Sequence, residues 1–299
     1  MEENVDKVIQ NLKKINEWID YNSPPPTNFK TNTEFMKFAV EIMNLCLYLL
    51  KTGAASAPDA ETARKGYTKP KAIIVGHIVR ITKLYEGSII HICNHQLELA
   101  AVFLRPLLEA AIKMEYFINS SSKKKSCRNF ILTSYRPEKE ILQDLNAKAE
   151  ERPLIQIEKR MKQKIVSRLK EDGISQTELM DNKTWDVDGK NFRSIMKMLD
   201  YDSMYSYGFG NASHYVHGDW YDIDLHHLKQ DGQYYTPDMD FDIPDPRLAC
   251  SLTGICLRTL LIYLKWNKSD PDGVITSLAE KLCKLNAALD AAHENTLGE

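Results

Sequence analysis

Residues 91–116 read HICNHQLELAAVFLRPLLEAAIKMEY, and this stretch decides the fold. Apolar residues recur here at three- and four-residue intervals, as they do along nearly the whole chain, whereas the alternation typical of strands is almost absent. A helix that is apolar nearly all round is normally buried. We therefore predict an all-α fold, a multi-helix bundle around a central buried helix at about 88–119, with an interruption or kink near Gly87.

The polar residues of this helix fall on one narrow stripe when about 100° is allowed per residue. The stripe contains His91, His95, Glu98, Val102, Arg105, Glu109 and Tyr116. Burying a charge is costly unless it is paired. Arg105 and Glu109 lie one turn apart and can pair along the helix, but the guanidinium then still needs an acceptor from another element.

Two interpretations of the stripe remain open. In the first, Arg105 and Glu109 are a structural ion pair that fixes how helices dock. In the second, they line a cleft and bind an anion such as a phosphate or carboxylate. The ligand-binding candidates are then Arg105, Glu109, Tyr116, Tyr205, His91 and His95. His91 and His95 also have the spacing of zinc ligands, but two ligands do not make a site, and we predict no metal.

A second informative segment, residues 205–220, reads YSYGFGNASHYVHGDW. Ser213 and His217 lie one helical turn apart, and Gly218 can end the helix. They fit a nucleophile and its base if a third group orients the imidazole, and otherwise they satisfy partners in the core. Because two polar stripes on buried elements face each other or water, we expect this segment to meet the first. The catalytic candidates are His217, Ser213, Arg105 and Glu109.

The rest of the chain suggests an N-terminal helical segment at 1–68 and a helical core domain at 69–299, packed as one unit. Residues 219–246 form a long acidic loop with eight Asp and three Pro, of a length typical of lids and binding loops. Metal-ligand residue types gather in its first part, namely Asp219, Asp222, Asp224, His226 and His227. We favour an acidic surface loop over a metal site there.

The composition is that of a soluble globular protein: 299 residues, 43% hydrophobic and 27% charged. A net charge of −2 attracts neither nucleic acid nor an anionic membrane. Six scattered Cys without a C-x-x-C motif, and an acidic N-terminus without an apolar core, indicate a cytoplasmic protein with reduced thiols. The most apolar segments, 87–104 and 248–264, contain charged residues, so we expect no membrane span.

The order and spacing of several short motifs resemble a known family. They are Arg105-Pro-Leu-Leu-Glu109, Tyr116, Trp185, Tyr205 and Ser213-x-x-x-His217-Gly218. Together they are similar to a bacterial helical family known only as a domain of unknown function, number five-six-seven-seven, over roughly 70–220. The resemblance implies that Arg105, Glu109, Ser213 and His217 belong together.

That family is similar in outline to the helical nucleotide-binding and ribonuclease domains called HEPN, in which an Arg shortly precedes a His on one helix. Here Asn211 and Ala212 stand where that Arg would be, so Arg105 has to supply the charge from another helix.

Three functions fit these observations. The first is binding of a small anionic ligand or nucleotide in a buried polar pocket, in a bacterial sensing, defence or toxin-type role. The second is a metal-independent ribonuclease, with His217 as general base and Arg105 at the phosphate. The third is a non-enzymatic interaction or scaffold module. No cofactor is expected, nucleic acid is a partner only under the second hypothesis, and a homodimer is left open.

Overall fold

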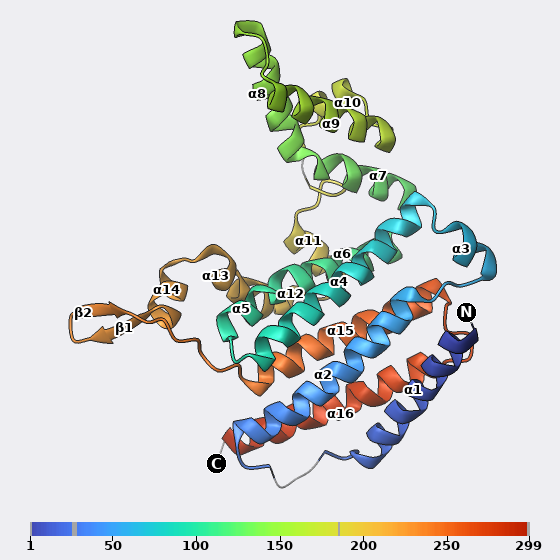
Figure 1. The fold of residues 1–299 in the computed structure, drawn as a ribbon, viewed down its shortest axis with the longest axis vertical. Coiled ribbons are helices and arrows are strands. Elements are labelled where there is room, and N and C mark those ends of the chain that lie inside the picture. Colours follow the sequence, from blue (N-terminus) through green and yellow to red (C-terminus); the bar gives the residue numbers. More distant parts are fainter. Residues whose placement is uncertain (1, 26–28, 185, 298–299) are drawn as a thin grey trace. The chain divides into compact units, whose positions relative to one another are not determined.

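The computed structural model describes residues 2–25, 29–184 and 186–297. Almost all regular structure in these ranges is helical, which confirms the all-α prediction (Figure 1). Trp185, one of the residues that carry the family resemblance, lies outside them. The chain forms two compact units, residues 1–118 with 199–299 and residues 119–198. The chain therefore divides after residues 118 and 198.

The first unit is the larger. Its helices are α1 Glu2–Tyr21, α2 Asn32–Ala55, α3 Ala60–Lys65, α4 Lys69–Cys93, α5 Leu97–Val102, α6 Leu104–Asn119, α12 Asp202–Met204, the π-helix η1 Tyr205–Gly210, α13 Asn211–His217, α14 Trp220–His226, α15 Pro246–Asn267 and α16 Val274–Leu297. A two-stranded antiparallel hairpin joins α14 to α15, with β1 at Leu228–Asp231 and β2 at Tyr234–Pro237.

The centre of this unit is α15, which packs against α2, α4 and α16 (Figure 1). Its buried side chains include Cys256, Leu257 and Leu260, none of which is exposed. A buried hydrogen bond ties α15 to α4, because Tyr85 Oη lies 2.7 Å from Thr253 Oγ1. Thr253 donates its own proton to the carbonyl oxygen of Ala249, so the Tyr85 hydroxyl is the donor to Thr253.

The predicted central helix at 88–119 is wrong as a single element, since it spans the end of α4, then α5 and α6. The chain leaves α4 at Asn94, and His95 adopts a left-handed conformation with φ of 55°. The N–H of Gln96 donates to the carbonyl of His91, which closes the C-terminus of α4 in a Schellman arrangement. Pro106 lacks an N–H to bond the preceding turn, which separates α5 from α6.

Gly87 does not interrupt α4, contrary to our expectation. Its missing side chain instead lets Phe103 approach, because an added Cβ would lie 3.0 Å from the Phe103 ring.

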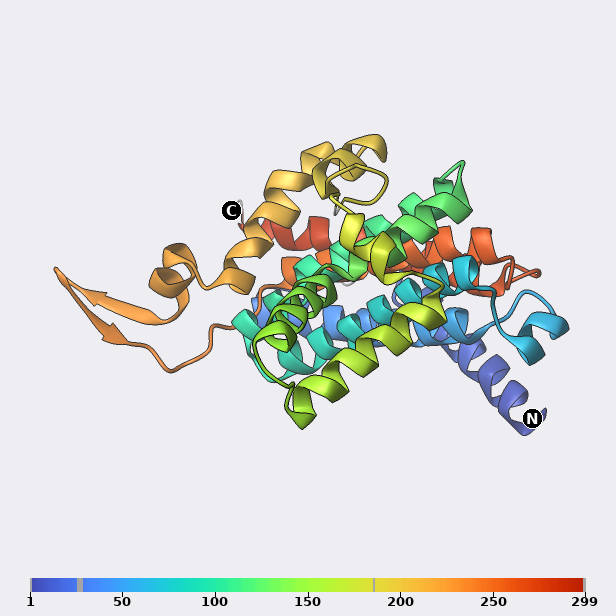
Figure 2. The same cartoon turned by 90° about the horizontal axis from the view of Figure 1, so that it is seen from above.

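The acidic segment 219–246 is also more ordered than the predicted loop. It contains α14 and the β1–β2 hairpin, which projects from the bundle in both views (Figure 1 and Figure 2). Asp219 starts α14, because its side chain accepts a hydrogen bond from the N–H of Asp222. The longest part without regular structure is the stretch between β2 and α15.

The second unit contains α7 Lys123–Ser134, α8 Arg136–Glu151, α9 Gln156–Asp172, α10 Gln176–Asp181 and α11 Phe192–Met198. A small apolar core holds it together, made of Tyr135, Leu142, Ile165, Leu169, Ile174 and Leu179. Ser175 caps α10 by accepting the N–H of Glu178, as the spacing of these two residues indicates. Arg152 pairs with Glu158 through two nitrogens, which lowers the pKa of that carboxyl to about 2.

Two helices, α2 and α15, are long and apolar enough to cross a membrane. Both pack in the core of the first unit, with 44% and 56% of their apolar windows buried. A helix buried in a bundle has the same length and composition, so these two give no argument for insertion.

We expect the substitution Tyr85→Phe to lower the free energy of unfolding by about 1–2 kcal/mol, because a buried hydrogen bond is lost and Thr253 Oγ1 loses its donor. Urea unfolding followed by circular dichroism measures this. Tyr234→Phe is the control, since Tyr234 is 81% exposed and its hydroxyl is in water. Equal stability of the two variants would contradict the role of this bond.

Candidate functional site

Arg105 and His217 meet at the surface of the first unit. Arg105 lies in the first turn of α6, and His217 is the last residue of α13. Arg105 Nη1 lies 2.7 Å from His217 Nε2, although 112 positions separate the two residues. This convergence was predicted from the sequence, and the distance confirms it.

The same guanidinium lies over an aromatic ring. Arg105 Cζ is 4.5 Å from the centre of the Phe209 ring, within the range of a cation–π interaction. The Phe209 ring is in turn stacked on that of Tyr205, with 5.5 Å between ring centres and 26° between planes. Arg105 is thus held between a π-face and an imidazole, and Tyr205, a predicted ligand residue, supports the ring beneath the guanidinium.

This contact determines the protonation of His217. A guanidinium has only donors, so Nη1 donates and Nε2 accepts. In this arrangement the imidazole is neutral, with its proton on Nδ1. His217 is exposed and Arg105 is half-buried, so the pair forms an open surface site. We predicted that this pair is buried. That prediction is wrong, because His217 ends its helix at the surface.

The charge of Arg105 is not neutralised by any carboxylate in the described part of the chain. Glu109, the partner that we predicted one turn along, instead accepts from Lys113 Nζ at 2.6 Å. Exposed i,i+4 pairs of this kind form readily on a helix surface. Arg105 therefore contributes its positive charge to the site.

Ser213 does not act with His217 in this structure. Its hydroxyl donates to the carbonyl oxygen of Phe209 at 2.7 Å, one turn back in the helix. This local bond is typical of Ser within helices and occupies the only proton that a base would take. This hydrogen bond supports the interpretation in which Ser213 satisfies a partner within the fold and is not a nucleophile.

A second histidine stands close by in the sequence. His214 Nδ1 lies 2.6 Å from Asp219 Oδ2, and its ring packs on that of Tyr221 with 4.7 Å between centres. The hydrogen bond from His214 lowers the pKa of the Asp219 carboxyl. This pair was not predicted from the sequence, because Gly218 separates the two helices. A His and an Asp five residues apart across a helix end were nevertheless a usable signal.

The π-helix η1 forms the backbone beneath the site. Its wider turn carries Tyr205 and Phe209, and Gly210 leaves room for the carbonyl oxygen of Tyr205, which would lie 3.3 Å from an added Cβ. Single π-turns within helices are frequent at functional sites.

The remaining predicted ligand residues lie elsewhere. His91 Nδ1 bonds Gln96 Oε1 at 2.7 Å, and its ring stacks on that of Phe103. His95 is exposed in the turn after α4, so it does not share a helix face with His91. Tyr116 is 6% exposed and packs beside Phe117 in the core. Within the described part of the chain, neither His91 nor His95 makes a hydrogen bond or ring contact with Arg105 or His217.

The first unit also contains a cavity of about 280 Å³. It lies between α6, α12 and α15, and its lining includes Leu108, Tyr201 and Arg258. Tyr201 Oη donates to Glu115 Oε2 at 2.6 Å, and Arg258 lies over the Tyr201 ring. Burial raises the pKa of Tyr201. None of the predicted ligand residues lines this cavity.

These observations define a class: an all-α protein with an exposed Arg–His pair on an aromatic support. Comparison with known families assigns it further. The model of a family of unknown function, DUF5677, matches residues 71–234, and the chain belongs to this family. The match covers Arg105, Glu109, Ser213 and His217, as the motif resemblance predicted. No curated protein and no solved structure matched the chain.

We expect the His217 imidazole to carry its proton on Nδ1, because Nε2 accepts from Arg105. Long-range ¹⁵N–¹H NMR spectra of histidine-labelled protein identify the protonated nitrogen. In Arg105→Ala the preference for the proton on Nδ1 should weaken or reverse, whereas Arg247→Ala should leave this preference unchanged. A wild-type signal with Nε2 protonated would contradict the contact.

Proposed function

We propose that the protein binds a phosphate-bearing small ligand, a nucleotide, at the Arg105–His217 pair. The observation that carries this proposal is the guanidinium of Arg105, which is half-buried, positioned by two neighbours and without a carboxylate partner in the described residues. A fixed cation of this kind is suited to a planar anion, because its remaining N–H groups can donate in parallel to two oxygens.

The surroundings favour a nucleotide over a bare anion. Directly after the site, α14 begins with Trp220 and Tyr221, whose side chains are 60% and 58% exposed. Exposed aromatic rings next to a cation are the usual support for a stacked base. His214 packs on Tyr221 and orients that ring.

Local charge favours a small ligand over a long polyanion. The segment that follows the site contains Asp222, Asp224 and Asp231, and the chain as a whole has a net charge of −2. Extended nucleic acid needs a row of basic contacts, whereas one phosphate group needs one well-placed cation. We assign the protein to a cytoplasmic sensing or defence role of the kind expected from its sequence. The exposure of His217 argues against a purely architectural role for the pair.

We expect Arg105→Ala to weaken nucleotide binding by at least about tenfold, since a charge-assisted hydrogen bond contributes roughly 1.5–3 kcal/mol. A thermal-shift screen of nucleoside mono-, di- and triphosphates selects the ligand, and isothermal titration calorimetry gives the affinity. Arg247→Ala is the matched control, because Arg247 lies in the same unit but is paired with Asp245. Unchanged affinity in Arg105→Ala, or no nucleotide bound by the wild type, would exclude the proposal.

A second candidate, a metal-independent ribonuclease, is favoured by the His214–Asp219 pair. Under this hypothesis Arg105 turns from His217 to the phosphate and frees Nε2 of neutral His217, which then takes the proton of a ribose 2′-hydroxyl as the hydroxyl oxygen attacks the adjacent phosphorus. Arg105 stabilises the charge that develops on the phosphate oxygens. The bond from phosphorus to the 5′-oxygen then breaks, and His214, oriented by Asp219, donates a proton to the leaving oxygen. The products are a 2′,3′-cyclic phosphate and a 5′-hydroxyl.

Digestion of a labelled single-stranded RNA in EDTA tests this candidate. We expect His217→Ala to lose at least about 100-fold in rate, in the range that general acid–base catalysis contributes. His95→Ala is the control, because His95 is exposed in the turn after α4. Ribonuclease activity that is equal in the wild type and His217→Ala, or absent from both, would exclude His217 as a catalytic base. The proposal would then be nucleotide binding without catalysis.

A further inference from the structure

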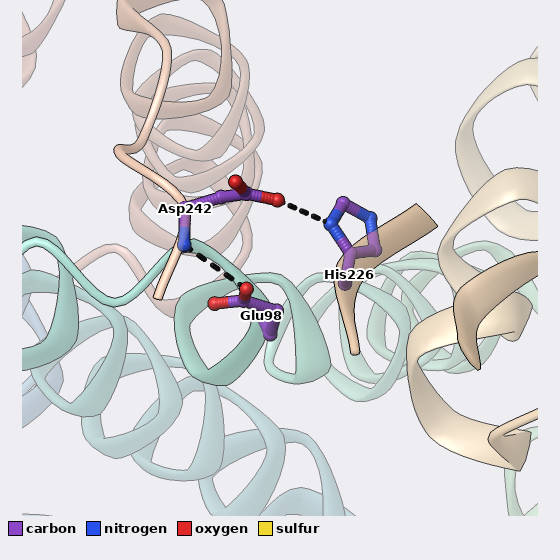
Figure 3. Close-up of side chains that lie close together, drawn as sticks. All are labelled: Glu98, His226 and Asp242. Carbon is purple, nitrogen blue, oxygen red and sulfur yellow. Dashed lines mark hydrogen bonds and ion pairs between the residues drawn. The ribbon is translucent and has the colours of Figure 1, made fainter. Parts of the chain in front are cut away.

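Three metal-ligating side chains meet at a place that the Arg105–His217 pair does not use (Figure 3). Glu98 comes from the first turn of α5, His226 is the last residue of α14, and Asp242 lies in the stretch between β2 and α15. Each offers one ligand atom, and these atoms all lie within 4.8 Å of one another. Three separate segments of the first unit therefore supply the cluster.

Backbone contacts hold the three residues in place. The N–H of Asp242 donates to Glu98 Oε1 at 3.0 Å, and the carbonyl oxygen of Asp242 accepts from the N–H of Leu97 at 2.9 Å. The Asp242 side chain points the other way, with Oδ2 at 2.6 Å from His226 Nδ1 (Figure 3). The cluster is thus prepared by the fold and does not depend on loose surface side chains.

An independent observation indicates that the cluster needs a further partner. Glu98 is 6% exposed, and its second oxygen, Oε2, is buried without a hydrogen-bond donor among the described residues. A buried carboxylate oxygen without a donor is unfavourable, because it has lost its hydrogen bonds to water and formed no hydrogen bond in their place. The cluster has two carboxylates, and among the residues that the structure describes no Lys or Arg side chain contacts Glu98 or Asp242.

We propose that Glu98, His226 and Asp242 bind one divalent cation of the first transition row, with Zn²⁺ as the representative. Two carboxylates compensate its charge, and the imidazole favours such ions over Mg²⁺ and Ca²⁺, which take oxygen ligands. Glu98 and His226 are buried, whereas the Asp242 side chain is 53% exposed. The exposed side leaves coordination positions to water, as in sites with three protein ligands.

The geometry accommodates the ion with a small adjustment. Ligand atoms about 2.0–2.2 Å from a tetrahedral zinc ion are roughly 3.4 Å apart. When the ion binds, His226 Nδ1 loses its proton to solvent and coordinates through its lone pair, so its hydrogen bond to Asp242 is replaced by two bonds to the metal. Asp242 Oδ2 and His226 Nδ1 then move apart, whereas the ligand atoms that are up to 4.8 Å apart move together, and the exposure of the Asp242 side chain permits these shifts of about 1 Å.

The ion would join segments far apart in the sequence. Glu98 belongs to α5, whereas His226 and Asp242 lie just before and just after the hairpin, so the metal connects both ends of the hairpin to the bundle. Binding to the folded chain alone stabilises it by mass action. The metal should therefore raise the melting temperature and protect the hairpin connection from proteolysis.

The test uses the full-length protein after removal of metals with EDTA and dialysis. Titration with Zn²⁺, Mn²⁺ or Co²⁺, followed by calorimetry and elemental analysis, should give one tightly bound ion per chain and a higher melting temperature. Glu98→Gln, His226→Gln and Asp242→Asn should each weaken binding by at least about 10-fold. The controls Asp240→Asn and His227→Gln should bind as the wild type does, because Asp240 is 91% exposed and His227 faces Asp222.

Glu98→Gln keeps the acceptor for the N–H of Asp242, so this variant is expected to fold, and circular dichroism confirms it. Two results would overturn the proposal. In the first, the wild type binds no ion and Glu98→Gln is more stable than the wild type. Glu98 would then be an ordinary buried acid. The other is equal binding in all three ligand variants, which would place the ion elsewhere. Nucleotide affinity does not enter this test, so it stands apart from the proposed function.

Discussion

The hydrogen bond from Arg105 to His217 is the interaction on which the site depends. It exists because the start of α6 lies beside the end of α13. Pro106 separates α5 from α6 and leaves Arg105 in the first turn of α6. Gly218, with a left-handed φ of 58°, ends α13 directly after His217. The guanidinium donates to Nε2 of the imidazole, and an uncharged acceptor of this kind leaves the guanidinium its full charge. A carboxylate at position 217 would have formed an ordinary ion pair and removed the positive site.

Part of the candidate site could be predicted from the sequence. Arg105 on an otherwise apolar helix and His217 before a glycine were each expected to need a polar neighbour, and few segments offered one. The prediction that they converge therefore rested on the cost of burying a charge, although the pair lies at the surface. Glu109 was assigned to Arg105 on spacing alone. Lys113 stands at the same spacing on its other side, and a sequence does not tell which of two equivalent neighbours a carboxylate selects.

The errors in the fold have a common physical cause. Apolar periodicity reports burial, and it continues across residues 94–96 because both α4 and α5 are buried. The break depends on His95 adopting positive φ, which glycine commonly does and histidine seldom does. The acidic segment was taken for a loop since Asp residues obscure strand alternation, yet its two short strands need only a Gly232 turn to pair. Glu98, His226 and Asp242 gather through backbone contacts that no spacing rule contains.

The two candidate sites depend on the same elements. Arg105 and Glu98 lie on either side of the junction between α5 and α6, and His217 and His226 lie at the ends of α13 and α14, which Gly218 and Asp219 join. Helix α13 packs against α5, so a change in the distance between α14 and α5 is transmitted to the helix that carries His217. An ion at Glu98 and His226 would hold that distance constant. Any coupling between the two sites must then be reciprocal, with each ligand changing the affinity for the other by the same factor.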